Sequence, residues 1–175
     1  MNKTIEDIFS RRSIKKYSDR KVSSEDLKLI AEAGIWAPSG SNSQKTISVV
    51  IQDKQLYTRL ERLNASVVGG DPDTRHNFYG ADAVILVLAD GRDSNCVANG
   101  ALVMENMMLA AHSLGLGSCW INRARETFET EEGRSLLREW GIDENYSGVG
   151  YCIIVYPEGD IPQPRARKEG RIIFK

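Results

Sequence analysis

The sequence has no strong excess of charge of either sign and no long apolar run. Lysine and arginine together number 23, against 24 aspartates and glutamates, which gives a formal net charge of -1. Such a chain offers no overall field that would attract a polyanion, so nucleic-acid binding is disfavoured. No 18 consecutive apolar residues occur, and residues 1–9 contain no apolar stretch long enough for a signal peptide. We therefore expect neither a nucleic-acid nor a membrane partner, and a cytoplasmic location.

Cysteine and histidine are also scarce. Cys96, Cys119 and Cys152 are widely spaced and odd in number, which matches neither a disulfide framework nor a zinc site. His76 and His112 lack a second ligand at metal-binding spacing, and no serine lies in a nucleophile-elbow sequence. We expect no metal and no hydrolase triad, and we expect the cysteines to be reduced residues of the core.

The overall composition is that of an ordinary folded protein. The chain has 175 residues, of which 41% are hydrophobic and 27% charged. No internal repeat, low-complexity tract or linker divides it. The sequence predicts a single domain over residues 1–175.

Helix predictions rest on capping residues and on apolar residues at helical spacing. Gly34, Gly115 and Gly141 provide plausible ends. The expected helices run from Thr4 to near Arg11, from Ser23 to Gly34, after Asp53 through Leu56, Leu60 and Leu63, from Asn95 to Leu114, and through Leu136, Leu137 and Trp140.

Strand predictions rest on runs of β-branched and apolar residues. The expected strands are Thr46–Ile51, Ala83–Ala89, Ser118–Ile121, Val149–Tyr156 and a short one at Arg171–Phe174. The uninterrupted apolar run at 83–89 predicts a central strand that is buried on both faces. Residues 64–80 have no clear period and are expected to form a loop or mobile flap. Interleaved helices and strands indicate a three-layer α/β or α+β domain.

The expected helix at 95–114 has apolar residues around most of its circumference. Asn99, Glu105 and Asn106 interrupt the apolar surface too often for a membrane span. Since such a helix must be covered nearly everywhere, we expect a partner subunit to cover it, and hence a dimer.

Two basic segments are suited to binding a phosphate. Arg11–Lys16 (Arg, Arg, Ser, Ile, Lys, Lys) follows the end of a predicted helix, and Pro164–Lys168 contains Arg165 and Arg167. Arginine donors match phosphate oxygens, and alternate residues of an extended chain share a face. The alternatives are that the first segment complements a helix dipole and that the second is a solvated tail.

A third segment, Ala37–Gln44 (Ala, Pro, Ser, Gly, Ser, Asn, Ser, Gln), consists mainly of short hydrogen-bonding residues before a strand. Its side chains could bind a polar ring or hydroxyl groups, and Gly40 allows close backbone approach. A simple connecting loop is the alternative. Gly115 and Gly117 do not complete a dinucleotide fingerprint, because no third glycine opens a following helix.

Taken together, these segments resemble the nitroreductase family of FMN enzymes. The resemblance rests on Arg11–Lys15, Ala37–Gln44, Leu114–Ile121 (Leu, Gly, Leu, Gly, Ser, Cys, Trp, Ile) and Pro164–Arg167, in that order along the chain. It implies an α+β fold, a three-layer α/β/α sandwich with a mostly antiparallel central sheet. It also implies a homodimer with FMN in the subunit interface.

The resemblance implies roles for particular residues. Arg11, Ser13, Arg165 and Arg167 would bind the phosphate, and Lys15 would favour the anionic reduced flavin. Pro38, Ser39, Asn42 and Gln44 would contact the ring and ribityl chain from the opposite subunit, and Ile121 and Asn122 would border the reactive nitrogen. The full cofactor-binding set is Arg11, Arg12, Ser13, Lys15, Pro38, Ser39, Gly40, Asn42, Gln44, Ile121, Asn122, Arg165 and Arg167.

The implied activity is a ping-pong transfer of hydride from NADH or NADPH, through the flavin, to a small electrophilic acceptor such as a nitroaromatic, a quinone or a flavin. Arg75, Phe78 and Tyr79 are candidate lid residues. Lys45 and Thr46 stand where the family usually has proline and an aromatic residue, which puts in doubt the packing beneath the flavin. A flavin carrier or sensor, a reductive dehalogenase-like member and a non-flavin interaction domain are the alternatives.

Overall fold

The fold is built around one antiparallel sheet of four strands. The computed structural model describes residues 1–69 and 71–175, so Gly70, within the expected flap, lies outside the described residues. The strands are β1 (Thr46–Ile51), β2 (Ala83–Asp90), β3 (Gly117–Ile121) and β4 (Tyr146–Val155), in the order β1-β2-β4-β3. Every pairing is antiparallel. All residues of β2 are buried, which confirms the predicted central strand.

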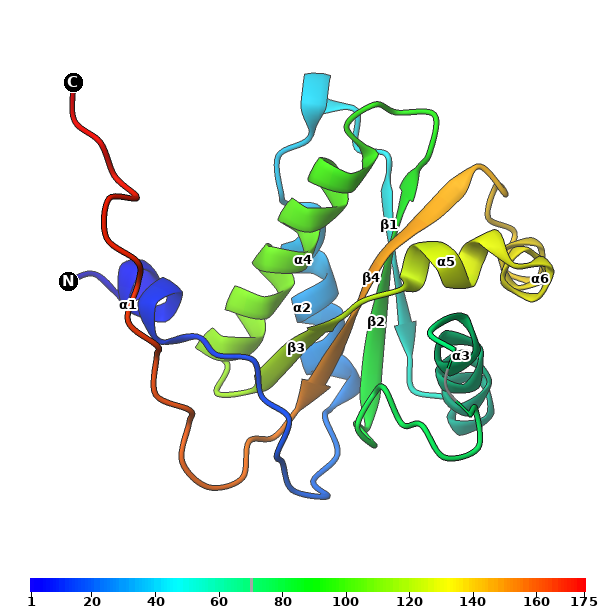
Figure 1. Cartoon of the computed structure of the whole chain (residues 1–175), viewed down its shortest axis with the longest axis horizontal. Coiled ribbons are helices and arrows are strands. Elements are labelled where there is room, and N and C mark those ends of the chain that lie inside the picture. Colours follow the sequence, from blue (N-terminus) through cyan, green and yellow to red (C-terminus); the bar gives the residue numbers. More distant parts are fainter. Residues whose placement is uncertain (70) are drawn as a thin grey trace.

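Helices cover both faces of the sheet, as Figure 1 shows. The helices are α1 (Lys3–Ser10), α2 (Ser24–Ile35), the 3-10 turn η1 (Gly40–Asn42), α3 (Lys54–Val67), α4 (Cys96–Ser113), α5 (Ala124–Glu129) and α6 (Glu131–Glu139). One face packs on α2 and α4, and the other on α3, α5 and α6. This is the three-layer α+β sandwich expected from the resemblance.

The apolar pattern of the strands explains the two cores. Alternate residues of β2 point to opposite faces, so Val84 and Leu86 join the core under α3 and α5, whereas Ile85 and Val87 join the core under α2 and α4. Gly100 lets α4 approach β4 closely, because a Cβ there would lie 2.4 Å from Val149 Cγ2. The position of α4 in turn places the segments at its two ends.

Local signals set most helix ends. The Ser23 side chain accepts from Asp26 N at 3.0 Å, and Asp53 accepts from Leu56 N at 2.8 Å, as their predicted capping roles require. The first helix differs, because Asn2, and not Thr4, is its N-cap and accepts from Ile5 N. Among the cysteines, Cys119 and Cys152 are buried, but Cys96 is only half-buried because it begins α4.

Two other predictions were wrong. The third helix does not end at Leu63 but continues to Val67, because Leu63, Asn64 and Ala65 still face the core. Residues 171–174 form no strand, and Ile172, Ile173 and Phe174 are exposed with no neighbouring strand edge in the described chain. None of the helices in the described parts of the chain combines the length and apolar character needed to cross a membrane.

Candidate functional site

The basic segment after α1 lies beside the start of β3. Ile14 N donates to Ser118 O at 3.0 Å, and Ser13 forms an isolated parallel bridge with Ser118. Gly117 permits this approach, since a Cβ there would lie 2.8 Å from Ile14 Cβ. Buried Ile14 anchors the segment, while Ser13 and Lys15 on either side of it remain exposed.

Three polar atoms in this region are buried without a hydrogen-bond partner among the described residues. They are Arg11 Nη1, Arg12 Nε and Ser118 Oγ. Arg11, Arg12 and Ser118 also line one small cavity. Buried donors are normally paired, so unpaired donors from two arginines and a hydroxyl fit an anionic group such as a phosphate.

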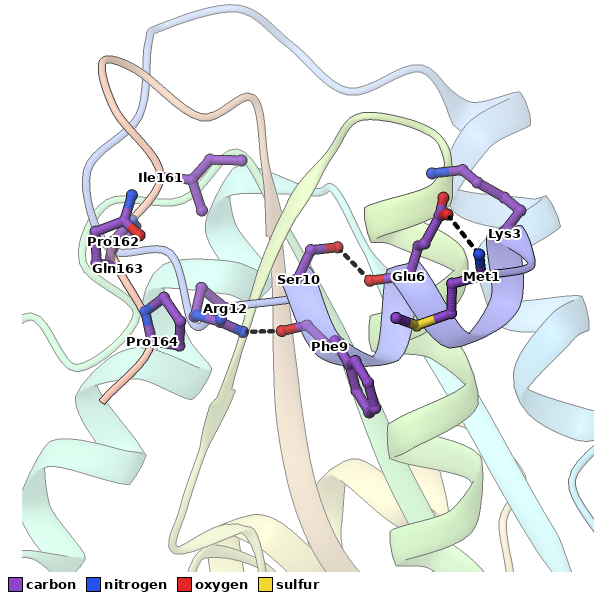
Figure 2. Close-up of a pocket in the computed structure, with 10 residues that line it drawn as sticks. All are labelled: Met1, Lys3, Glu6, Phe9, Ser10, Arg12, Ile161, Pro162, Gln163 and Pro164. Carbon is purple, nitrogen blue, oxygen red and sulfur yellow. Dashed lines mark hydrogen bonds and ion pairs between the residues drawn. The ribbon is translucent and has the colours of Figure 1, made fainter. Parts of the chain in front are cut away.

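The C-terminal tail lies alongside this segment. A cleft of about 590 Å³ separates α1 from residues 161–164, with Arg12 and Pro164 on its wall (Figure 2). Arg12 Nη1 donates to Phe9 O at 2.7 Å and to Arg11 O at 2.6 Å, which holds the guanidinium at the helix end. Arg165 and Arg167 follow this stretch but do not line the cleft, and both are exposed.

The polar loop at 38–44 has an unusual backbone. Ser41, Asn42 and Gln44 have φ angles of 53°, 52° and 50°, a region that side-chain-bearing residues seldom adopt. Ser39 Oγ accepts from Gln44 N at 3.0 Å, and Gln44 Nε2 donates to Asn42 Oδ1 at 3.1 Å. The loop therefore holds two exposed amide side chains in a fixed arrangement, with Pro38 also exposed.

The two predicted clusters do not meet within one chain. Gly40 N donates to Asn99 Oδ1 at 3.0 Å in the first turn of α4, and His112 Nε2 lies 2.7 Å from Ser10 Oγ in its last turn. A rise of 1.5 Å per residue puts these two contacts about 20 Å apart along the helix. The structure therefore brings Arg11, Arg12 and Ser13 together, and leaves the 38–44 loop at the other end of α4.

Lys15 contributes to a separate pocket of about 300 Å³. Lys15, Ile121 and Asn122, three of the predicted site residues, line it. Lys15 Nζ donates a hydrogen bond to Tyr79 Oη at 2.9 Å and lies 4.6 Å from the centre of the Tyr79 ring. The hydrogen bond to Tyr79 raises the pKa of Lys15. The ammonium group is therefore held, fully charged, at the pocket wall.

The segment expected to form a mobile flap is anchored at its end. Phe78 is fully buried, with its ring 4.9 Å from that of Tyr151, so it is a core residue and not part of a lid. Glu61 Oε1 accepts from Phe78 N at 2.8 Å, and Tyr17 Oη donates to Tyr79 O. Burial raises the pKa of Tyr17 to about 12, so it remains a donor. Arg75 and Tyr79 do lie at the pocket, on its exposed rim.

The sequence prediction missed five residues of this pocket, of which Asn64, Asn77 and Arg123 carry amide or charged side chains. Asn64 carried a signal, because it stands four residues after Leu60 on the apolar stripe of α3. A polar residue at such a position usually has a buried hydrogen-bonding role. Asn77 and Arg123 lie in irregular segments and carried no comparable signal. Within the described residues, no group of three potential metal ligands lies together.

Comparisons with known proteins show which family and which structures the chain is similar to. The family model described as "Nitroreductase family" matches residues 8–155. A protein of Archaeoglobus fulgidus, named as an inferred NADH dehydrogenase/NAD(P)H nitroreductase, is 32% identical over 166 residues, which cover 91% of this chain and 88% of that protein.

Two further comparisons cover nearly the whole chain. The NADPH-flavin oxidoreductase of Vibrio harveyi is 30% identical over 187 residues, which cover 99% of this chain and 73% of that protein. A crystal structure of a nitroreductase with bound FMN from Bacteroides fragilis has a TM-score of 0.87 and 29% identity, over 99% of both chains.

Proposed function

The chain belongs to the nitroreductase family, and from this premise we propose that it binds FMN and passes a hydride from NADH or NADPH to a small electrophilic acceptor. Bound FMN would supply the redox chemistry, by accepting the hydride and giving it up again. The protein would supply binding, orientation and charge. The Vibrio harveyi relative is named for NADPH and flavin, and the Bacteroides fragilis structure holds FMN, which supports both parts of the proposal.

The observation that carries the proposal is the set of buried donors near the start of β3 that have no partner in the part of the chain that the structure describes. Arg11 Nη1, Arg12 Nε and Ser118 Oγ would bind the FMN phosphate, with Ser13 beside them. Each hydrogen bond to a charged group contributes about 1.5–3 kcal/mol. Arg165 and Arg167 would add to this site from the tail that runs alongside α1.

Lys15, Ile121 and Asn122 would lie at the redox-active part of the cofactor, because they line the pocket that adjoins the same β3 segment. The Lys15 ammonium favours the gain of negative charge by a group bound beside it. Tyr79 keeps that ammonium in position through its hydrogen bond. The hydride donor and the acceptor would occupy this pocket in turn, as a ping-pong mechanism requires, and nitroaromatics, quinones and flavins are the proposed acceptors.

We further propose that the site is shared between two copies of the chain. Exposed apolar side chains lie on α1, at the end of α2 and on α4. They include Phe9, Trp36, which directly follows α2, and Val97, which are 63%, 79% and 60% exposed. Covering them with a second copy would remove this apolar area from water. Such a dimer would let Pro38, Ser39, Gly40, Asn42 and Gln44 of one copy join the basic segment of the other, although about 20 Å separates them in one chain.

The test of the proposed function is an absorbance spectrum of the purified protein, followed by additions of NADH and NADPH under nitrogen. We expect a flavin spectrum that either nucleotide bleaches and that an added quinone restores. A flavin spectrum that neither nucleotide bleaches faster than free FMN would indicate a carrier or sensor. A protein that stays colourless after incubation with FMN would contradict the proposal.

A further inference from the structure

The pocket beside Lys15 has an uneven distribution of charge. Three of its lining residues, Lys15, Arg75 and Arg123, carry positive charge, and none of the described residues that line it is a carboxylate. The Arg123 charge is partly offset, because its Nη1 lies 2.5 Å from Glu126 Oε1. Among the described residues Lys15 and Arg75 contact the neutral side chains of Tyr79 and Asn77 and no carboxylate, so the pocket attracts a negatively charged group.

A chain of amide side chains holds Arg75 at this pocket. Asn64 Nδ2 donates to Asn122 O at 2.9 Å, Asn77 Nδ2 donates to Asn64 Oδ1 at 2.7 Å, and Arg75 Nε donates to Asn77 Oδ1 at 3.0 Å. Asn64 is only 1% exposed, so the middle of this chain is shielded from water. A buried hydrogen-bond network of this kind fixes the orientation of its members.

The backbone on the other side of Asn77 is also fixed. Glu61 accepts from Phe78 N at 2.8 Å, its second oxygen lies 3.2 Å from His76 Nδ1, and Phe78 is buried in the core. Arg75 therefore projects from an anchored segment, although its own side chain is exposed. Its Nε is used by Asn77, which leaves the two terminal nitrogens to bind a carboxylate or phosphate through parallel hydrogen bonds.

We propose that Arg75 determines specificity for an oxyanion group, a carboxylate or a phosphate, on one of the two molecules that use the redox pocket. Asn77 and Asn64 are positioning residues, because they act on the ligand through Arg75. The inference rests on the proposed function for the identity of those molecules. The oxyanion has two possible sources, the 2′-phosphate of NADPH or a carboxylate on the acceptor.

Binding measurements on the purified protein, with whatever flavin it retains, distinguish these sources without depending on turnover. Titration calorimetry gives the dissociation constants of two pairs of ligands, 2′,5′-ADP with 5′-AMP and 4-nitrobenzoate with 4-nitrobenzamide. The first member of each pair carries the additional negative charge. We expect Arg75→Gln to weaken the more highly charged member of one pair by about tenfold or more, since the loss of even one of the two charged hydrogen bonds costs that much, and to change its partner less than twofold. The matched control is Arg125→Gln, an exposed arginine of α5 that pairs with Glu129.

The pair that responds identifies the source of the oxyanion. Equal effects on both members of each pair, or no effect on either pair, would overturn the proposal. Asn77→Ala should reproduce part of the selective loss, because it releases Arg75 without removing its charge. The melting temperature should fall as well, because buried Asn64 Oδ1 loses its donor, so the selectivity between the two members of a pair is the diagnostic readout. A selective effect of Arg75→Gln in a protein that NADH and NADPH fail to reduce would refute the proposed function and leave the anion site standing.

Discussion

Replacing Arg11 by methionine should weaken FMN binding without lowering the free energy of unfolding of the apoprotein. The side chain is 22% exposed, its Nη1 is buried without a partner in the described chain, and its Nε lies 3.8 Å from Glu105 Oε1. Loss of one charged hydrogen bond to a phosphate costs about 1.5–3 kcal/mol, which weakens FMN binding by about 10- to 150-fold. Methionine keeps much of the aliphatic volume, so packing is largely retained.

The same substitution should leave the apoprotein at least as stable. A buried unsatisfied donor costs about 1–3 kcal/mol, whereas a partly exposed ion pair at this distance contributes about 0–1 kcal/mol. Quenching of FMN fluorescence gives the dissociation constant, and urea unfolding of the apoprotein gives the stability. Arg125→Met is the matched control. An unchanged FMN affinity, or an apoprotein destabilised by more than about 2 kcal/mol, would refute the reasoning.

Three further predictions concern the tail, the packing of α4 and the acid limit of stability. Arg165→Ala should weaken FMN binding by about 1.5–3 kcal/mol, roughly tenfold or more, in the same fluorescence titration; an unchanged affinity would remove this residue from the phosphate site. Gly100→Ala should lower the urea midpoint of unfolding, because overpacking against Val149 costs about 1–3 kcal/mol and exceeds the helix-propensity gain of about 1 kcal/mol. The double variant Gly100→Ala/Val149→Ala should recover part of this loss. Hydrogen bonds from Arg92 hold the pKa of Asp90 at about 2. The ionised carboxylate therefore stabilises the fold fully above its ordinary pKa of 3.8, and this contribution is lost as the pH falls from there towards 2. Thermal unfolding between pH 2 and 7 should show a weaker acid dependence for Asp90→Asn than for the unchanged protein, and identical profiles would contradict the assignment.

Local patterns were sufficient to predict most of the elements. The Ser23 and Asp53 caps and the apolar run at 83–89 depend on neighbouring residues only, and each has the predicted role. The fold class followed from the resemblance, and the antiparallel sheet confirms it. The strand order β1-β2-β4-β3 depends on contacts between distant residues, which local patterns do not specify.

The predicted site was harder to assess from sequence because its parts come from distant segments. Ser13 and Ser118 are 105 positions apart, and only the bridge between them brings the basic segment to β3. The amide chain through Asn64 and Asn77 was missed because it depends on how the end of α3 meets the turn at 76–79. The strand expected at 171–174 lacks a neighbouring edge within the described chain, and strand propensity alone does not supply one.

The central claim, a cofactor site shared by two copies of the chain, is tested most directly by mixing two defective variants. One carries Arg11→Met and Arg165→Ala, and the other carries Asn42→Ala and Gln44→Ala. A shared site predicts that each parent binds FMN weakly and that the mixed dimer binds one FMN tightly, because one of its two sites receives both intact segments. Weak binding at both sites of an isolated mixed dimer would contradict the account, since each site would then belong to a single chain.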